Sequence, residues 1–445
     1  MTRSVALKVL SQLTHNDLTE YSIQAVLRGL HDKSCHVRRV AVLACAKVHK
    51  LQPEFVKERE VIDQLYALIR DSDPVVMLNC LHSLDEILRH DGGVVINKKI
   101  NNYLLNRLTE VSSSLLPGVV TYLQRYQPQT EQDVYDVMNI CDEYLNHTDA
   151  SVVCAFTRYM LQVTHDLPAV NHQLLVRVTQ PLLTLLNTAN PELVFTILNF
   201  IQEIYCKPDS DHCKLIASNY GAFLCKQKDP VYVKIKRMTI LCRLVTEANL
   251  KNVLDEYYTH ASSSHDDISS RAITCIAAVA AGNVHFLTAS LHCLTKLLSL
   301  ERPHVSADVI RILANLKLDP ADGKTIADIM QCVCRYSLSN DGGDVDASLL
   351  WLLGDYGEFC DSAVYVFENC FKQFQSWQDT EASTCLISTA VKLFIKRPAQ
   401  CQHVLGQVLE AAFLHGNTMT KQSVKYYYSL LSNQFNATKR IVDRL

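Results

Sequence analysis

Glycine and proline are scarce in this 445-residue chain, which contains 13 glycines and 12 prolines. The chain also lacks a Gly/Ser/Pro-rich linker or a block of like charges that would separate domains. Its length alone would suggest about three globular domains. Because nothing divides it, we expect one continuous, elongated unit over residues 1–445.

An excess of one charge sign and long apolar runs are also missing. The 43 basic and 46 acidic residues give a formal net charge of −3, so the composition provides no overall basic surface for nucleic acid. The longest apolar run, near Ile273 to Ala281, is far shorter than a membrane span, and charge interrupts the apolar stretch in Met1–Lys8. We expect a soluble protein that is not secreted and does not bind nucleic acid.

Catalytic and metal-binding signatures are absent from the sequence. It has no glycine-rich phosphate loop, no HExxH and no GxSxG. The 17 cysteines form no CxxC motif, and we interpret them as small, reduced hydrophobic residues of a cytosolic protein. Three clusters have metal-ligand residue types without the paired spacing of a zinc site: His31–Cys35–His36, His212–Cys213 and Cys332–Cys334.

We therefore predict no catalytic, cofactor-binding or metal-binding residues, no cofactor and no enzymatic activity. One alternative from this class stays open, namely an enzyme whose site is assembled from residues that are distant in sequence.

What the sequence does contain is a helical repeat. Asp32 and Asp71 are 39 residues apart, and so are Val37 and Val76, each pair at matching places in an apolar pattern. The repeat spacing in this sequence is therefore 35 to 40 residues. Such a period is typical of helix-turn-helix units of the HEAT or armadillo kind. On the order of ten helical pairs would fit in the chain.

The second copy of the repeat has the expected turn chemistry. Asp73 is a candidate N-cap, and Pro74 occupies the first helical position after it. Two apolar stripes follow helical spacing: Val61, Leu65, Leu68 and Ile69, then Val76, Cys80, Leu84, Ile87 and Leu88. A stripe of this kind must be covered by a neighbouring repeat. The sequence thus predicts an all-α, HEAT/armadillo-type alpha-alpha superhelix, or solenoid.

Residues 231–236 alternate as in a strand, but the longer pattern favours a helix. Val231, Ile235, Met238, Cys242 and Val245 step by three and four residues. Asp229-Pro230 repeats the pattern of a cap followed by proline.

Two basic clusters are the only candidates for a binding surface. The first comprises Arg38, Arg39, Lys47, His49 and Lys50, and the second comprises Lys226, Lys228, Lys234, Lys236 and Arg237. Either could contact acidic lipid or an acidic partner, or could simply be a solvated helix face. The second cluster is denser and is the better, though weak, candidate.

Trp351 lies in a run of large residues that contains Gly354. We expect a buried tryptophan at a seam between repeats, with Gly354 permitting close helix contact.

The same segment carries a family resemblance. Trp351–Glu358 with Asp361–Ala363 resembles the W-[IL]-[VL]-G-[ED]-Y-x-E stretch of the beta-type large subunits (beta adaptins) of adaptor-protein coat complexes. Four other segments match family motifs in order: Val37–His49, Asp71–Val76, Asp229–Lys234 and Val391–Pro398. Within the family, Gly92–Lys98, Leu104–Arg107 and Arg125–Pro128 look most like the beta subunit of adaptor complex four.

This resemblance implies the curved trunk of a heterotetramer with a second large chain, a medium chain and a small chain. The function it implies is non-enzymatic: vesicle-mediated protein transport and cargo sorting. Similarity to the fourth complex implies peripheral association with the cytosolic face of trans-Golgi network and endosomal membranes, recruitment by an Arf-type GTPase, and no dependence on clathrin.

The chain departs from the family at both ends. It begins inside what resembles a B helix of the trunk, and Tyr426–Leu431 resembles the trunk's end. We therefore expect the first helical pairs, which help engage the GTPase, to be absent, together with the hinge and appendage. A fragment, an incomplete gene model and a short isoform all fit. The alternative function is a general HEAT scaffold for a phosphatase or a transport receptor.

Overall fold

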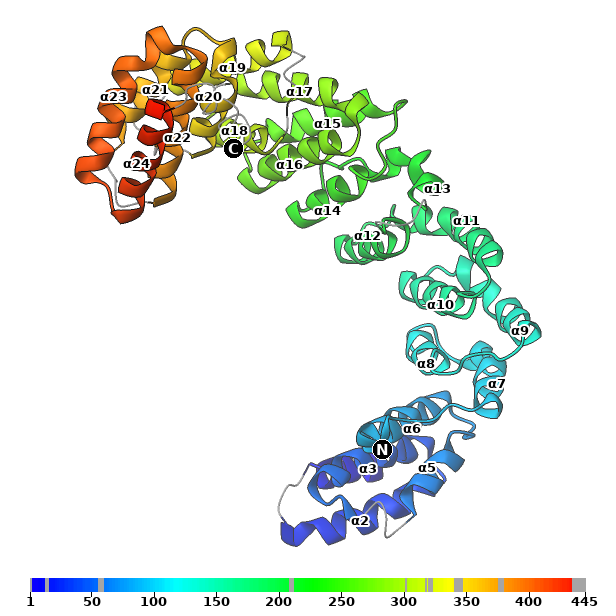
Figure 1. Ribbon diagram of the computed structural model, residues 1–445. Coiled ribbons are helices and arrows are strands. Elements are labelled where there is room, and N and C mark those ends of the chain that lie inside the picture. The colour runs from blue at the N-terminus through cyan, green and yellow to red at the C-terminus, as the bar shows by residue number, and fades with distance from the viewer. Residues whose placement is uncertain are drawn as a thin grey trace. The chain divides into compact units, whose positions relative to one another are not determined.

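The computed structural model describes residues 2–12, 16–54, 60–207, 212–300, 302–316, 318, 323–339, 347–374 and 380–433. Over these residues the regular elements are α-helices and short 3-10 helices, and no strand occurs (Figure 1). The predicted all-α fold is confirmed. No helix in the described ranges combines the length and the apolar character needed to cross a bilayer.

The chain divides into two compact units, Met1–Phe200 and Ile201–Leu445. The expectation of one continuous trunk over residues 1–445 stays a prediction. The first unit holds α1 (Thr2–Leu10), α2 (Asn16–Leu30), α3 (Cys35–Leu51), α5 (Val61–Leu68), α6 (Pro74–Ile87), α7 (Lys98–Asn106), α8 (Leu116–Leu123), α9 (Glu131–Cys141), α10 (Ala150–Val163), α11 (Pro168–Leu185) and most of α12 (Pro191–Tyr205).

The second unit continues with α13 (Cys213–Ala217), α14 (Val231–Leu241), α15 (Leu250–Ala261), α16 (Asp266–Gly282), α17 (Val284–Leu298), α18 (Pro303–Asn315), α19 (Gly323–Ser339), α20 (Ala347–Tyr356), α21 (Ala363–Gln373), α22 (Thr380–Lys396), α23 (Pro398–His415) and α24 (Thr418–Asn433). Short 3-10 helices, among them η4 (Tyr220–Phe223) and η6 (Gly357–Phe359), lie between them.

Each unit is built from two layers of helices. In the first unit, α1, α3, α6, α8 and α10 pack one on the next, and α2, α5, α7, α9 and α11 cover them. In the second unit, α14, α16, α18, α20, α22 and α24 form one layer, and α15, α17, α19, α21 and α23 form the other (Figure 1). Successive helices of one layer belong to successive repeats, as in a solenoid.

Hydrogen bonds across the seams reproduce the repeat length. Ser83 Oγ donates to the Val42 carbonyl oxygen at 2.8 Å, 41 residues earlier. In the second unit, Thr389 Oγ1 donates to the Leu350 carbonyl oxygen at 2.9 Å, 39 residues earlier. Both bonds join a buried hydroxyl to a helix backbone one repeat away, so the period seen in the sequence is the period of the stacking.

The local predictions for α5 and α6 are largely confirmed. The Asp73 side chain accepts a hydrogen bond from the Val75 N–H at 2.9 Å, and Pro74 is the first residue of α6. The stripe residues of both helices are buried, apart from Leu68 and Leu88, which are partly exposed.

For α14 the predicted helix is confirmed, but its cap and its buried face are wrong. Pro230 occupies the N-cap position, and Asp229 instead pairs with Arg237. Val231 is exposed and Ile235 and Cys242 are only half-buried, because the buried face runs through Val233, Arg237, Met238, Ile240 and Leu241.

Around Gly354 the predicted close contact is present. A Cβ at Gly354 would lie 3.4 Å from the Thr389 Cα, so α20 and α22 approach closely there. Trp351 is only half-buried, which corrects the expectation of a fully buried ring. Its ring packs edge-on against Tyr356, with ring centroids 6.1 Å apart.

Candidate functional site

Three residues of the first basic cluster, Arg38, Arg39 and Lys50, form ion pairs within the first unit. Arg38 makes a two-pronged contact with Asp71, Nε to Oδ2 at 2.7 Å and Nη2 to Oδ1 at 2.9 Å. Arg39 reaches Asp73 at 2.7 Å, and Lys50 reaches Glu86 at 2.9 Å. Arg38, Arg39 and Lys50 therefore stabilise the seam between α3 and α6, while Lys47 is exposed and His49 is half-buried.

The Asp71 carboxylate is held ionised by this contact. Burial by itself raises the pKa of a carboxyl group, but hydrogen bonds from Arg38 and from the Asp73 N–H outweigh it, so the pKa of Asp71 lies below its usual value. Asp71 is thus a structural anion at neutral pH.

The second basic cluster does not form one surface either. The Arg237 side chain has no exposed area, and its Nε lies 2.8 Å from Asp229 Oδ2 while Nη1 donates to the Ala222 carbonyl oxygen at 2.7 Å. Lys226 and Lys228 are exposed on the preceding loop, whereas Lys234 and Lys236 are half-buried on α14. The second basic cluster, which the sequence offered as a weak candidate for a binding surface, therefore consists of one arginine in a buried ion pair and of lysines that lie apart on the surface.

A pocket with unneutralised cations lies beside α14 instead. It has a volume of about 770 Å³ and is lined from α14, α16 and the start of α17 by residues that include Thr239, Arg243, Arg271 and Phe286. Arg271 donates to Thr239 Oγ1 at 2.8 Å, and no carboxylate in the described part of the chain pairs with Arg243 or Arg271. Burial and the neighbouring Arg271 lower the pKa of Lys236.

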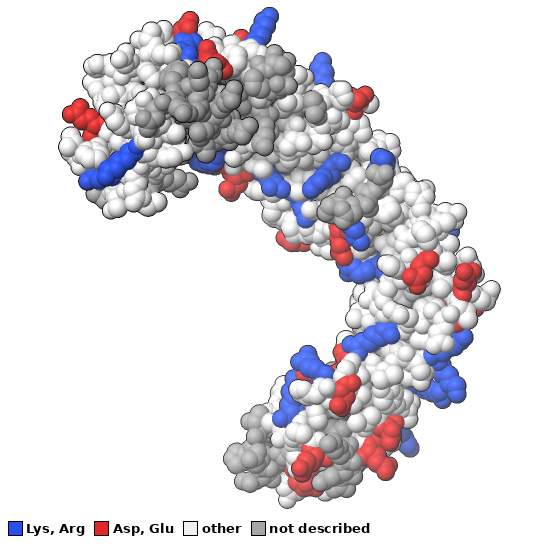
Figure 2. Space-filling view, viewed as in Figure 1, with Lys and Arg blue, Asp and Glu red and all other residues white. Residues whose placement is uncertain are grey.

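Sequence reasoning missed Arg243 and Arg271, because neither lies in a run of basic residues. Repeat spacing could have indicated one contact, since Arg271 and Thr239 are 32 residues apart at the same seam. Over the visible face of the molecule, acidic and basic side chains are otherwise interspersed (Figure 2).

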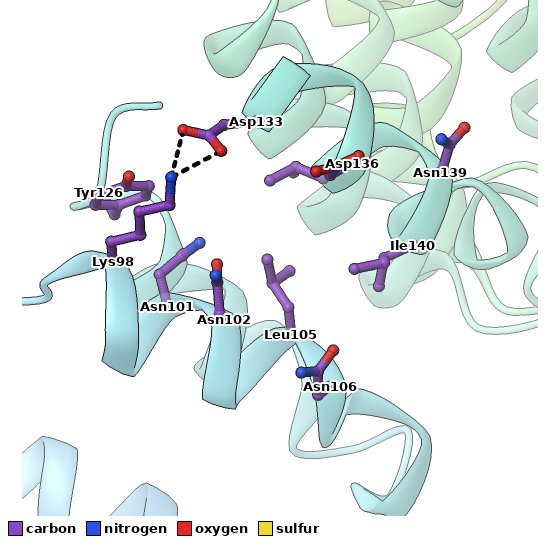
Figure 3. Close-up of a pocket in the computed structure, with 11 residues that line it drawn as sticks. Lys98, Asn101, Asn102, Leu105, Asn106, Tyr126, Asp133, Asp136, Asn139 and Ile140 are labelled. Atoms are coloured by element: carbon purple, nitrogen blue, oxygen red, sulfur yellow. Dashed lines mark hydrogen bonds and ion pairs between the residues drawn. The ribbon is translucent and has the colours of Figure 1, made fainter. Parts of the chain in front are cut away.

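A second pocket, of about 390 Å³, separates α7 from α9 (Figure 3). Lys98 Nζ donates to both carboxylate oxygens of Asp133, at 2.9 and 3.0 Å, across one side of it. Asn101 is 1% exposed, and neither atom of its amide has a hydrogen-bond partner among the described residues. The lining offers amides and an internal ion pair without a nucleophile beside a base, which suits binding better than catalysis.

At none of the three metal-like clusters of the sequence do three potential donors lie together among the described residues. Among the described residues, one group of three potential donors lies together, and it contains none of them. Cys213 shares a side-chain hydrogen bond with Cys206 rather than with His212, and Cys332 is half-buried while Cys334 is buried. No disulfide joins any two of the 17 cysteines in the structure.

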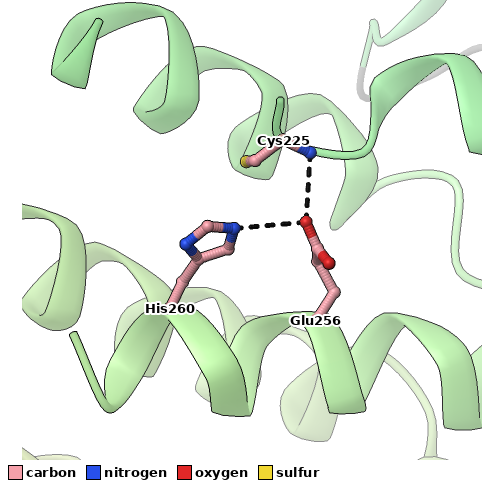
Figure 4. Close-up of side chains that lie close together, drawn as sticks. All are labelled: Cys225, Glu256 and His260. Carbon is pink, nitrogen blue, oxygen red and sulfur yellow. Dashed lines mark hydrogen bonds and ion pairs between the residues drawn. The ribbon is translucent and has the colours of Figure 1, made fainter. Parts of the chain in front are cut away.

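The one group consists of Cys225, Glu256 and His260 (Figure 4). Glu256 Oε1 accepts from the Cys225 N–H at 3.0 Å and lies 3.2 Å from His260 Nε2. The hydrogen bond to His260 lowers the pKa of Glu256, and burial raises the pKa of the Cys225 thiol to about 12. The sequence could not show this group, because Cys225 lies 31 residues before Glu256.

Comparison with known proteins decides the family. The model of the adaptin N-terminal region matches residues 1–432. This chain belongs to the adaptin family. The adaptin chain is 32% identical to AP-4 complex subunit beta-1 of Mus musculus over 444 residues, which cover 99% of this chain and 59% of the mouse protein.

Other beta adaptins are more distant. Beta-adaptin-like protein A of Arabidopsis thaliana is 25% identical over all of this adaptin chain and 53% of its own length. AP-1 complex subunit beta-1 of Homo sapiens is 26% identical over 99% of this chain and 46% of its own length. This adaptin chain therefore spans about half the length of the curated relatives it matches.

The fold has a structural counterpart. A chain in a homology model of the full-length AP-3 complex, in an intermediate open conformation, superposes with a TM-score of 0.54 over 97% of this adaptin chain and 78% of that chain. Because the sequences are 15% identical, this likeness supports the helical-repeat fold alone.

Proposed function

We propose that this adaptin is the trunk of a beta-type large subunit in a heterotetrameric vesicle-coat adaptor. Its partners would be a second large chain, a medium chain and a small chain, and its function would be cargo sorting in vesicle-mediated protein transport. The observation that carries the proposal is the match to the adaptin N-terminal region over residues 1–432. The 32% identity to the AP-4 relative over 99% of the chain supports it.

The architecture is suited to association rather than chemistry. Two layers of stacked helices leave long exposed faces, and permanent complexes bury well over the roughly 1,600 Å² of a standard interface. Large apolar side chains are exposed on α23 and α24, at Phe413, Leu414, Met419, Tyr426 and Tyr428. We propose a non-catalytic role in which both units form one continuous trunk over residues 1–445.

The similarity to AP-4 supports a finer proposal about location. The complex would be peripheral on the cytosolic face of trans-Golgi network and endosomal membranes, recruited by an Arf-type GTPase and independent of clathrin. The unneutralised Arg243 and Arg271 would offer a contact for an acidic segment of a partner chain.

Affinity purification of the tagged chain from cells of its source organism, followed by mass spectrometry, tests the proposal. Recovery of one other large, one medium and one small adaptor chain in equal amounts is the expected result, with the complex identified by those chains and clathrin not enriched. Recovery of phosphatase subunits or transport-receptor cargo without adaptor chains would establish the general HEAT scaffold instead.

A further inference from the structure

Three side chains with metal-binding donors converge at one seam of the second unit. Glu256 and His260 are four residues apart on α15, so they lie on the same face of that helix. Cys225 lies on the loop between η4 and α14, 31 residues before Glu256. The three donor atoms, a sulfur, a carboxylate oxygen and a ring nitrogen, all lie within 4.8 Å of one another (Figure 4).

The spacing of these donors fits a tetrahedral metal ion. Glu256 Oε1 and His260 Nε2 are 3.2 Å apart. Two ligands bound at zinc distances of 2.0 to 2.1 Å at a tetrahedral angle are separated by roughly 3.3 Å. Cys225 Sγ makes only a weak contact, 3.7 Å from the Lys234 carbonyl oxygen, so a metal ion would meet little competition for this sulfur.

The backbone holds this geometry in place. The Cys225 N–H donates to the same Glu256 oxygen that faces His260, which fixes the loop to the carboxylate. Support of a ligand by a second hydrogen bond is usual in metal sites. A neighbouring cation, Arg237, is paired with Asp229, with Nε 2.8 Å from Oδ2. Solvent has access, since the side chains of His260 and Glu256 are 18% and 23% exposed.

We propose that Cys225, Glu256 and His260 bind Zn²⁺, with a water molecule as the fourth ligand. A thiolate and an imidazole favour zinc over Mg²⁺ or Ca²⁺, which prefer sets of oxygen ligands. The ion would join the loop that precedes α14 to α15, so it would stabilise this seam and would tie consecutive repeats together. The proposal does not rest on the adaptor function, because zinc binding is measured on the chain alone and assembly is measured separately.

Competition with a chromophoric zinc chelator, using the full chain after removal of metal, tests the proposal directly. We expect one tight Zn²⁺ equivalent, and a loss of affinity on the order of 100-fold in Cys225→Ser. Bound Co²⁺ should show a thiolate charge-transfer band that Cys225→Ser abolishes. The matched control Cys332→Ser replaces another half-buried cysteine and should leave both signals unchanged.

A second variant guards against a folding defect. His260→Gln removes a donor from a partly exposed helix position, so far-UV circular dichroism should stay native while zinc affinity falls. No zinc binding by the wild-type chain would overturn the proposal. So would binding that survives both variants, or binding that is lost in Cys213→Ser, since the metal would then belong to other thiols.

Discussion

Two seams of the same repeat architecture differ in whether their arginines are paired with carboxylates. Between α3 and α6, the arginines at the start of one helix find aspartates in the turn before the next, as in Arg38 with Asp71. Between α14 and α16, Arg271 finds only the hydroxyl of Thr239. Apolar packing stacks the helices in both places. The two seams differ in their charge balance: one is neutral, and the other has cations that an anion from outside the chain could contact.

The largest expected effect comes from breaking the neutral seam. Arg38→Ala would leave the Asp71 carboxylate, whose side chain is 6% exposed, without its partner. We expect the local unfolding free energy of α6 to fall by about 3 kcal/mol, as for other mostly buried pairs. Hydrogen exchange with mass spectrometry of peptides from α6 measures this, because a long repeat chain does not unfold in one two-state step.

The open seam supplies the matched control. Arg271→Ala removes a hydrogen bond to a neutral hydroxyl, so the loss of protection in α16 should correspond to about 1 kcal/mol or less. Equal losses in the two variants would contradict the distinction between the seams.

A third seam, between α20 and α22, is closed by backbone proximity rather than by charge alone. Gly354→Leu would place side-chain atoms where Thr389 and Lys392 already lie, at 3.3 to 3.5 Å from a Cβ. We expect a loss of about 2 kcal/mol from overpacking, measured as a lower protection of α22. Gly406→Leu is the control, because nothing lies within 4 Å of a Cβ at that helical glycine.

Lowering the pH should reduce hydrogen-exchange protection at the first seam more than at the second, without any mutation. The pKa of Asp71 in the folded chain lies below the unfolded value of about 3.9, so its contribution is complete above that value and is lost as the pH falls through the folded pKa. Protection of α6 should therefore drop below about pH 3.9 more than protection of α16. In Asp71→Asn this extra sensitivity should disappear; its persistence would assign the effect to other carboxylates.

The smallest predicted effect has the opposite sign. Lys236 is half-buried beside Arg271, and burial and this like charge both disfavour its charged form. Lys236→Gln should raise the stability of α14 by about 0.5 kcal/mol, in contrast to the loss in Arg38→Ala. Lys228→Gln, on the exposed loop, should change nothing measurable, and a loss of stability in Lys236→Gln would mean that its contacts outweigh the repulsion.

The sequence contained the fold because helix period and repeat length are local patterns. Asp73 and Pro74 start α6 as predicted, and hydrogen bonds such as that from Ser83 to Val42 reproduce the repeat. The prediction of the buried face of α14 was wrong because an arginine is usually exposed, whereas Arg237 is buried in an ion pair with Asp229.

The binding surfaces could not be predicted for a related reason. Arg243 and Arg271 meet at one pocket, and Cys225 meets His260, only because stacking brings different repeats together. Each residue taken alone has no distinctive sequence context. The family motifs in turn identify the chain without indicating which of its surfaces bind partners.

Native mass spectrometry of the chain co-expressed with the second large, medium and small adaptor chains of its source tests the central claim most directly. A single species with the summed mass of the four chains, one copy of each, is the result we predict. Purified chain that stays at its own mass of 50.2 kDa beside an assembled complex of the other three would contradict the proposal that it is an adaptor trunk.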